Sequence, residues 1–161
     1  MHMGVDYSTK KVAAALVDER GRLLAVESHE FKGKGYDSGF EFVVNEYRRL
    51  LYRWLLYYQV GSLALEAPIV GLSGNPQTAI RMSMVCGAMM LISNDHRLPV
   101  SLVPVSTWKK DVCGNGGFDK AHVAHWLYEN HPGIRSLCST DDEVDAVCIA
   151  LYSRGRKDDG V

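Results

Sequence analysis

The 161-residue sequence predicts one α/β domain, built on a five-stranded mixed sheet with helices on both faces. Three observations predict it. Short apolar runs separated by turn residues open the chain, which is typical of an antiparallel meander. Apolar strands then alternate with segments whose apolar residues recur at helical spacing, which favours parallel strands. The length suits one buried core, and no repeat or interdomain linker is visible.

Five strands are expected, at residues 3–7, 11–18, 23–28, 62–66 and 100–105. The turn sequence Asp18-Glu-Arg-Gly21 separates the second strand from the third, so the first three are expected to be antiparallel. The fourth is a short apolar run that Pro68 ends. The sheet is therefore predicted to have three antiparallel strands followed by parallel ones.

Helices are expected at residues 38–59, 77–95, 119–130 and 141–153, with a shorter one that Ser106 caps. In the first, aromatic and apolar residues recur at helical spacing, and Ser38 with Glu41 forms a capping box. Residues 71–76 have loop composition. Residues 1–154 are expected to form the domain, and residues 155–161 a C-terminal tail.

Composition excludes several classes of protein. Apolar residues make up 47% and charged residues 23%, an ordinary globular balance. No apolar run approaches the roughly 20 residues of a membrane-spanning helix, and no signal peptide is recognised, so a cytoplasmic protein is expected. The four cysteines form no Cys-x-x-Cys pair, so zinc is not expected and the thiols are expected to be reduced.

The net charge is −1, whereas a protein that only grips phosphates is usually basic. A metal-dependent nuclease differs, because the carboxylates at its centre offset basic residues elsewhere. The charge alone therefore does not exclude a nucleic-acid enzyme.

Four acidic residues are the candidate site. Asp6 and Glu66 each end a strand that should be buried, and buried carboxylates are costly unless they are paired or bind a cation. Asp142 and Asp145 lie three apart on one side of a predicted helix. Carboxylate oxygens favour Mg²⁺ or Mn²⁺ over zinc.

Each acid also has a structural interpretation. Asp6 and Glu66 are compatible with ordinary strand ends. Asp141, Asp142 and Glu143 suit the first turn of a helix, where negative charge opposes the helix dipole. Asp145 lies one turn further along the helix, beside the apolar face, so the helix dipole does not explain it.

The motifs in their order resemble the RuvC family of Holliday-junction resolvases, over nearly the whole chain. The matching segments are Gly4-Val-Asp6-Tyr-Ser8, Leu65-Glu66, Trp108-Lys109-Lys110 to Gly114-Asn-Gly116, Asp119-Lys120 and Asp142-Glu-Val-Asp145-Ala-Val-Cys-Ile-Ala150. The small size and divergent sequence are similar to a phage-encoded branch, which would act in the host-cell cytoplasm.

The resemblance implies an RNase H-like fold and a metal-dependent endonuclease. Such an enzyme cleaves four-way DNA junctions by paired nicks during recombination and repair, and works as a homodimer with two Mg²⁺ ions per site, for which Mn²⁺ substitutes. It also implies the residues. Catalytic metal ligands are expected at Asp6, Glu66, Asp142 and Asp145, with catalytic lysines at Lys109 and Lys120.

DNA contacts are expected from Lys34, Ile69, Arg81, Lys109, Lys110 and Lys120. Ile69 lies nearest to the position where the family commonly carries an aromatic wedge, so wedge-type recognition is not expected to carry over. The Asp141-Asp142 doublet leaves the ligand open by one residue, and the spacing to Asp145 favours Asp142. Trp108 is expected in the core.

The helix at 77–95 is apolar around most of its circumference, and one face carries Ile80, Met84, Gly87, Met90 and Leu91. A surface helix needs only one apolar stripe, so this helix is expected to form the dimer interface. Burial beneath the helix at 38–59 is the alternative.

Three other functions stay open. A nuclease of this fold could act on flaps, forks or RNA–DNA hybrids. An actin-like phosphotransferase would use residues 6–9 as a phosphate loop, but needs a second domain. A catalytically inactive nucleic-acid-binding regulator would not need its acids.

Overall fold

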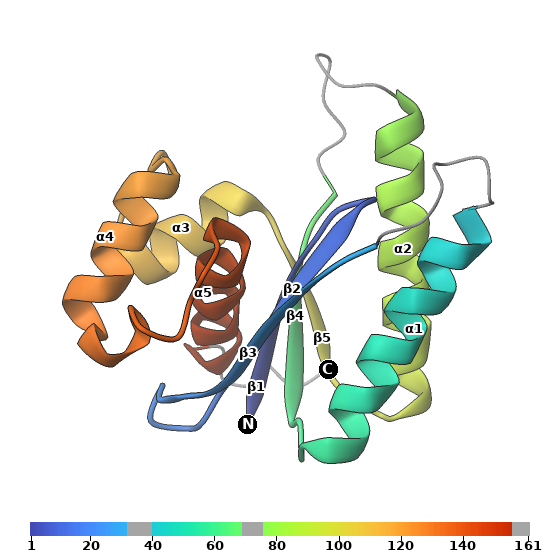
Figure 1. The fold of residues 1–161 in the computed structure, drawn as a ribbon, viewed down its shortest axis with the longest axis horizontal. Helices are drawn as coiled ribbons and strands as arrows, with labels where there is room; N and C mark the ends of the chain where they lie inside the picture. The colour runs from blue at the N-terminus through green and yellow to red at the C-terminus, as the bar shows by residue number, and fades with distance from the viewer. Residues whose placement is uncertain (32–39, 69–75, 156–161) are drawn as a thin grey trace.

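The computed structural model describes residues 1–31, 40–68 and 76–155 (Figure 1). Its elements are β1 (His2–Tyr7), β2 (Lys11–Val17), β3 (Leu23–Glu30), α1 (Phe40–Tyr57), β4 (Ser62–Glu66), α2 (Pro76–Asp95), β5 (Val100–Val103), α3 (Val105–Cys113), α4 (Lys120–Asn130), the short 3-10 helix η2 (Pro132–Ile134) and α5 (Asp141–Gly155).

The five strands form one mixed sheet in the order β3-β2-β1-β4-β5. β2 pairs antiparallel with both β1 and β3, while β4 pairs parallel with β1 and β5. This arrangement confirms the predicted fold class. The central strand β1 lies between antiparallel β2 and parallel β4.

Helices cover both faces of the sheet: α1 and α2 lie on one side, and α3, α4 and α5 on the other (Figure 1). Alternation along the strands builds a separate core under each layer. Val5 and Leu65 belong to the core beneath α1 and α2, whereas Ala13 and Ala64 belong to the core beneath α5.

Helix α5 packs directly against β1 at Gly4. A Cβ atom at this position would lie 2.1 Å from the backbone nitrogen of Ala150 and 2.3 Å from the carbonyl oxygen of Ala146. Only a residue without a side chain permits this approach. Ala146 and Ala150 are themselves completely buried, so small residues on both elements bring the helix axis close to the sheet.

Several sequence-based boundaries require correction. The third strand continues to Glu30, and the fifth ends at Val103. Ser106 is not the cap of α3: the helix begins at Val105 with Pro104 in the capping position, and no side chain caps it. Proline has no N–H for the strand ladder, so it ends β5, and the helix starts two residues earlier than expected.

Pro76 is the first residue of α2 rather than the last of a loop, a position that its fixed φ angle suits. The helix η2 was not predicted. Ser38 and residues 71–75 lie outside the described residues, as does most of the expected tail, since α5 continues to Gly155. Among the described helices, none is both long and apolar enough to cross a membrane.

Candidate active site

Asp6 and Glu66 lie side by side at the carboxyl ends of two neighbouring strands. Val5 pairs with Leu65 in the parallel register of β1 and β4, and the two acids are the next residues on each strand. Because Val5 and Leu65 face the core beneath α1 and α2, the acids face α5. Ends of central strands are where sites gather in sheets of this kind.

The first turns of α5 bring Asp142 and Asp145 to the same level. Ala146 contacts β1 at Gly4, and Asp142 lies one helical turn before it, a rise of about 6 Å. Asp6 lies two residues beyond Gly4, about 6.6 Å along the strand. Since α5 runs antiparallel to β1 (Figure 1), both steps lead to the same end of the sheet.

The charges of the four acids act on one another. Burial and the negative charges of Glu66, Asp145 and Asp142 together raise the pKa of Asp6 to about 8, although the charge of Lys120 opposes them. Burial likewise raises the pKa of Asp145 to about 6, with contributions from Glu66 and Asp142 that Lys120 and Lys109 oppose. The pKa of Glu66 is raised by burial. The structure therefore brings all four carboxylates into one electrostatic cluster.

Two lysines hold Asp142. The Nζ atom of Lys120 lies 3.2 Å from Oδ1, and the Nζ atom of Lys11 is paired with Oδ2. Burial alone would raise the pKa of Asp142, but the hydrogen bonds from Lys11 and Lys120 outweigh it and lower that pKa. Asp142 is therefore the acid of the cluster that stays ionised most readily.

Glu66 is held by a side chain of helix α3. The buried indole Nε1 of Trp108 donates a hydrogen bond of 3.2 Å to Oε2 of Glu66. The next residue, Lys109, donates from Nζ to the carbonyl oxygen of Phe118 at 2.7 Å, and its positive charge limits the rise in the pKa of Glu66 and of Asp145. Both lysines expected from the sequence, Lys109 and Lys120, therefore border the cluster.

Glu143 has a structural role. Its Oε2 accepts hydrogen bonds from the backbone N–H groups of Ser139 (2.6 Å) and Thr140 (3.2 Å), and the hydroxyl of Thr140 accepts one from the N–H of Glu143. This is a capping box at the start of α5. Asp141 is exposed, whereas Asp142 faces the other acids, so the geometry favours Asp142 as the member of the doublet that joins the site.

The remaining DNA-contact candidates are less closely placed. Lys110 is exposed on α3. Arg81 is half-buried on α2, whose first turns lie at the same end of the sheet but on its other face (Figure 1). Lys34 and Ile69 lie outside the described residues.

Sequence reasoning missed two contributors, Lys11 and the indole N–H of Trp108. Trp108 was expected in the core, and it is completely buried. Its hydrogen bond to Glu66 could not be predicted, because no spacing pattern in the sequence indicates that the two residues meet. Strand alternation offered a signal for Lys11. Ala13 pairs with Asp6 across β2 and β1, and Lys11, two residues before Ala13, lies on the same face of the sheet.

The donor set suits a hard divalent cation. It consists of carboxylate oxygens with neither histidine nor thiolate, and Mg²⁺ and Mn²⁺ prefer such ligands. The burial and mutual repulsion that raise the pKa of Asp6 and Asp145 are what a bound cation would relieve. Within the described ranges, no three acidic, histidine or cysteine side chains stand in a ready metal-binding arrangement, and both oxygens of Asp142 are bound by lysines instead.

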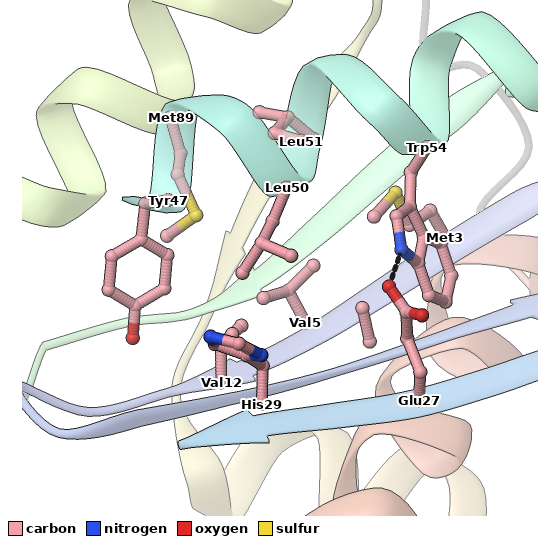
Figure 2. A pocket seen from close by; sticks show the side chains of 11 residues that line it. Met3, Val5, Val12, Glu27, His29, Tyr47, Leu50, Leu51, Trp54 and Met89 are labelled. Atoms are coloured by element: carbon pink, nitrogen blue, oxygen red, sulfur yellow. Dashed lines mark hydrogen bonds between the residues drawn. The ribbon is translucent and has the colours of Figure 1, made fainter. Parts of the chain in front are cut away.

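A separate apolar pocket lies between α1 and the sheet, on the face away from the acids (Figure 2). It is lined by residues such as Met3, Val5 and Leu51, with Glu27 at one end bonded by the indole N–H of Trp54. It belongs to the core beneath α1 and plays no part in the candidate site.

Known proteins resemble this chain over most of its length. The family model described as crossover junction endodeoxyribonuclease RuvC matches residues 2–153. A protein of that name from Idiomarina loihiensis is 24% identical over 155 residues, covering 92% of this chain and 84% of the relative. Another, from Salinibacter ruber, is 32% identical over 99 residues, covering 60% and 54%.

Solved structures share the fold. The RuvC of Thermus thermophilus in complex with a Holliday-junction substrate superposes with a TM-score of 0.75 at 17% identity, covering 92% of this chain and 89% of that one. A structure of T. thermophilus RuvC gives a TM-score of 0.74 at 19% identity, with coverages of 92% and 90%. With the family match spanning nearly every described element, the chain belongs to the RuvC family of crossover junction endodeoxyribonucleases.

Proposed function

We propose that this protein is a structure-selective endonuclease that resolves four-way DNA junctions by paired nicks, using two Mg²⁺ ions held by Asp6, Glu66, Asp142 and Asp145. The observation that supports the proposal is that the charges of Glu66, Asp142 and Asp145 all act on Asp6 at one end of the sheet, in a chain of this family. We also propose that the reaction takes place in the cytoplasm.

The chain's own residues divide the work. The charges of all three other acids raise the pKa of Asp6, so Asp6 would be the central ligand of the site. Glu66 is oriented by Trp108, and Asp142 and Asp145 are carried by α5. When bound, the cations polarise the scissile phosphate and lower the pKa of the attacking water.

Lys109 and Lys120 supply positive charge beside the acids. Lys109 is anchored at the carbonyl of Phe118 and Lys120 stands at the first turn of α4, so they flank the glycine-containing segment at 114–117. There they neutralise charge that develops on the phosphate during the reaction.

Cleavage of a synthetic mobile four-way junction in Mg²⁺ tests the proposal. Symmetric nicks in strands of like polarity are expected, with slower cleavage of matched flap, fork and RNA–DNA hybrid substrates. Preferential cleavage of one of the latter would assign the protein to another activity of the same fold.

Asp6→Asn tests the role of the acids. It should abolish cleavage while leaving junction binding intact, because one ligand is lost without adding bulk. Cleavage at the wild-type rate would show that Asp6 is not a ligand. Calorimetric titration with Mg²⁺ should show binding that Asp6→Asn weakens, whereas a catalytically inactive regulator would show no carboxylate-dependent binding.

Lys120→Met tests whether this lysine serves the substrate. The cleavage rate should fall with little change in melting temperature, because the Lys120 side chain is 54% exposed and exposed ion pairs stabilise folds weakly. A large fall in melting temperature with unchanged cleavage would make Lys120 a structural residue.

We also propose a homodimer formed through α2. Ile80, Met84 and Leu91 are 52%, 54% and 69% exposed on the outer face of the helix, while Val85 and Met89 pack inward. The helix is thus not fully buried beneath α1, and its outer face is an exposed apolar stripe that suits a second copy. A junction has two strands to cut, so two sites are needed.

Sedimentation at micromolar protein tests the dimer. A species of dimer mass is expected, and Gly87→Arg should dissociate it, because open space surrounds Gly87 and an arginine would project from the stripe. A species of monomer mass would refute the dimer.

A further inference from the structure

Both carboxylate oxygens of Asp142 are occupied by ammonium groups. Lys120 takes Oδ1, and Lys11, at the first position of β2, takes Oδ2. The side chain of Asp142 is only 15% exposed, whereas that of Lys11 is 54% exposed. Asp142 therefore forms two ion pairs. Lys120 belongs to the segments that resemble the family, whereas Lys11 does not.

The backbone of Lys11 is fixed more firmly than an exposed lysine usually is. Its N–H donates to Oγ of Ser8 at 3.0 Å, and its carbonyl oxygen accepts from the N–H of Ser8 at 2.8 Å. The buried hydroxyl of Tyr47 donates to the same carbonyl at 2.9 Å and bonds the backbone of Ser8. The turn after Asp6 and the start of β2 are thus clamped from the α1 layer, so the Lys11 side chain extends from a rigid base.

An oxygen that accepts from an ammonium group has less electron density to offer a cation. Lys11 and a metal ion therefore compete for Oδ2 of Asp142. Once the metal takes that oxygen, the Lys11 ammonium loses this partner while its backbone stays fixed beside the site. The ammonium is then available to a phosphate of the bound strand.

We propose that Lys11 is a third basic residue of this site: it neutralises Asp142 while the metal is absent and transfers to a DNA phosphate when Asp142 ligates the metal. This rests on the proposed function, because it takes Asp142 as a ligand. It adds that substrate contact and metal loading are coupled through one side chain.

Lys10 offers a matched control. It is the adjacent residue, carries the same charge and is exposed, yet it forms no ion pair in the part of the chain that the structure describes. Lys10→Met therefore makes the same change in net charge as Lys11→Met without touching Asp142. Lys11→Arg keeps the charge and serves as the conservative variant.

The first measurement is Mg²⁺ affinity by calorimetry without DNA. Lys11→Met should bind Mg²⁺ about fivefold more tightly than the wild type, the effect of removing one competing ion pair of about 1 kcal/mol. Lys10→Met should stay near the wild-type affinity. An equal gain in both variants, or none in Lys11→Met, would overturn the proposal.

The second measurement is the salt dependence of junction binding, with Ca²⁺ in place of Mg²⁺. Loss of one phosphate contact should reduce the slope of log K against log salt concentration by about 0.9 in Lys11→Met. Lys10→Met and Lys11→Arg should keep the wild-type slope. In EDTA the slope of Lys11→Met should equal that of the wild type, because Asp142 then holds the lysine.

A reduced slope in EDTA as well would show that Lys11 contacts DNA independently of the metal, and an unchanged slope in Ca²⁺ would show that it never does; either result overturns the transfer. Failure of the proposed function looks different, because the wild type would then not cleave the junction at all.

Discussion

The indole Nε1 of Trp108 lies 3.2 Å from Oε2 of Glu66, and the ring that carries it is completely buried in the core beneath α5. A core side chain thus sets the orientation of a carboxylate at the proposed metal site. Because the ring cannot move without disturbing the core, the position of Glu66 is tied to the packing of α3.

Trp108→Phe should therefore slow cleavage about tenfold while junction binding stays at the wild-type level. A six-membered aromatic ring stays in the core, but a hydrogen bond to a charged group, of about 1.5 kcal/mol, is lost with the pyrrole ring. Single-turnover cleavage and filter binding measure the two effects.

Trp54→Phe is the matched control. Trp54 is also buried and its indole N–H also bonds a carboxylate, that of Glu27, but on the opposite face of the sheet (Figure 2). Similar losses of cleavage in both variants would mean that the effect of Trp108→Phe comes from general destabilisation.

The raised pKa of Asp6 makes the stability of the metal-free protein depend on pH. Its pKa is about 8 in the fold against an ordinary value of 3.8, so the folded state holds a proton that the unfolded state releases. The stability that this proton supplies is complete below about pH 4 and is lost as the pH rises through about 8.

Asp6→Asn should remove this dependence. In EDTA its melting temperature should exceed that of the wild type at pH 8, by on the order of 5 °C, and approach it at pH 5. Asp95→Asn, at an exposed position at the end of α2, should follow the wild type at both values. A wild-type protein that gains stability from pH 5 to pH 8 relative to Asp6→Asn would contradict the prediction.

Glu143→Ala separates the structural acid of α5 from those of the site. It removes the acceptor of the capping box and of the 2.6 Å bond from the hydroxyl of Ser28, so unfolding should become easier by about 2 kcal/mol. Thermal melting measures the loss.

The Mg²⁺ affinity of Glu143→Ala should stay at the wild-type value. Asp145→Asn should instead lose Mg²⁺ affinity without any fall in melting temperature in EDTA at pH 7, because the raised pKa of Asp145 shows that its charge is costly to the metal-free fold. If the two substitutions had the opposite effects, the assignment of these two residues would be reversed.

Gly4→Ala should prevent normal packing of α5. The added Cβ would overlap backbone atoms of Ala146 and Ala150 that have no freedom to move aside, so a loss of more than about 3 kcal/mol is expected. Gly133→Ala is the control, since its Cβ meets nothing within 4 Å, and should stay within about 0.5 kcal/mol of the wild type. Equal chemical-denaturation midpoints for the two would disprove the close contact.

The sequence predicted the strands well because their apolar patterns and turn residues are local. It misplaced the start of α3, since Ser106 has the chemistry of a cap but Pro104, two residues earlier, already ends the strand. It could not separate Asp142 from Asp141 by composition. The two residues differ because Asp142 forms ion pairs with Lys11 of β2 and Lys120 of α4, and sequence spacing does not predict contacts between separate elements.

The close fit of α5 against Gly4 has a consequence for the proposed metal site. Asp6 and Glu66 belong to strands of the sheet, whereas Asp142 and Asp145 belong to α5, which follows all five strands in the chain. The sheet alone therefore carries only half of the proposed ligands. The other half reaches the site only when α5 docks on Gly4, so a defect in this packing should disable metal binding as well as stability.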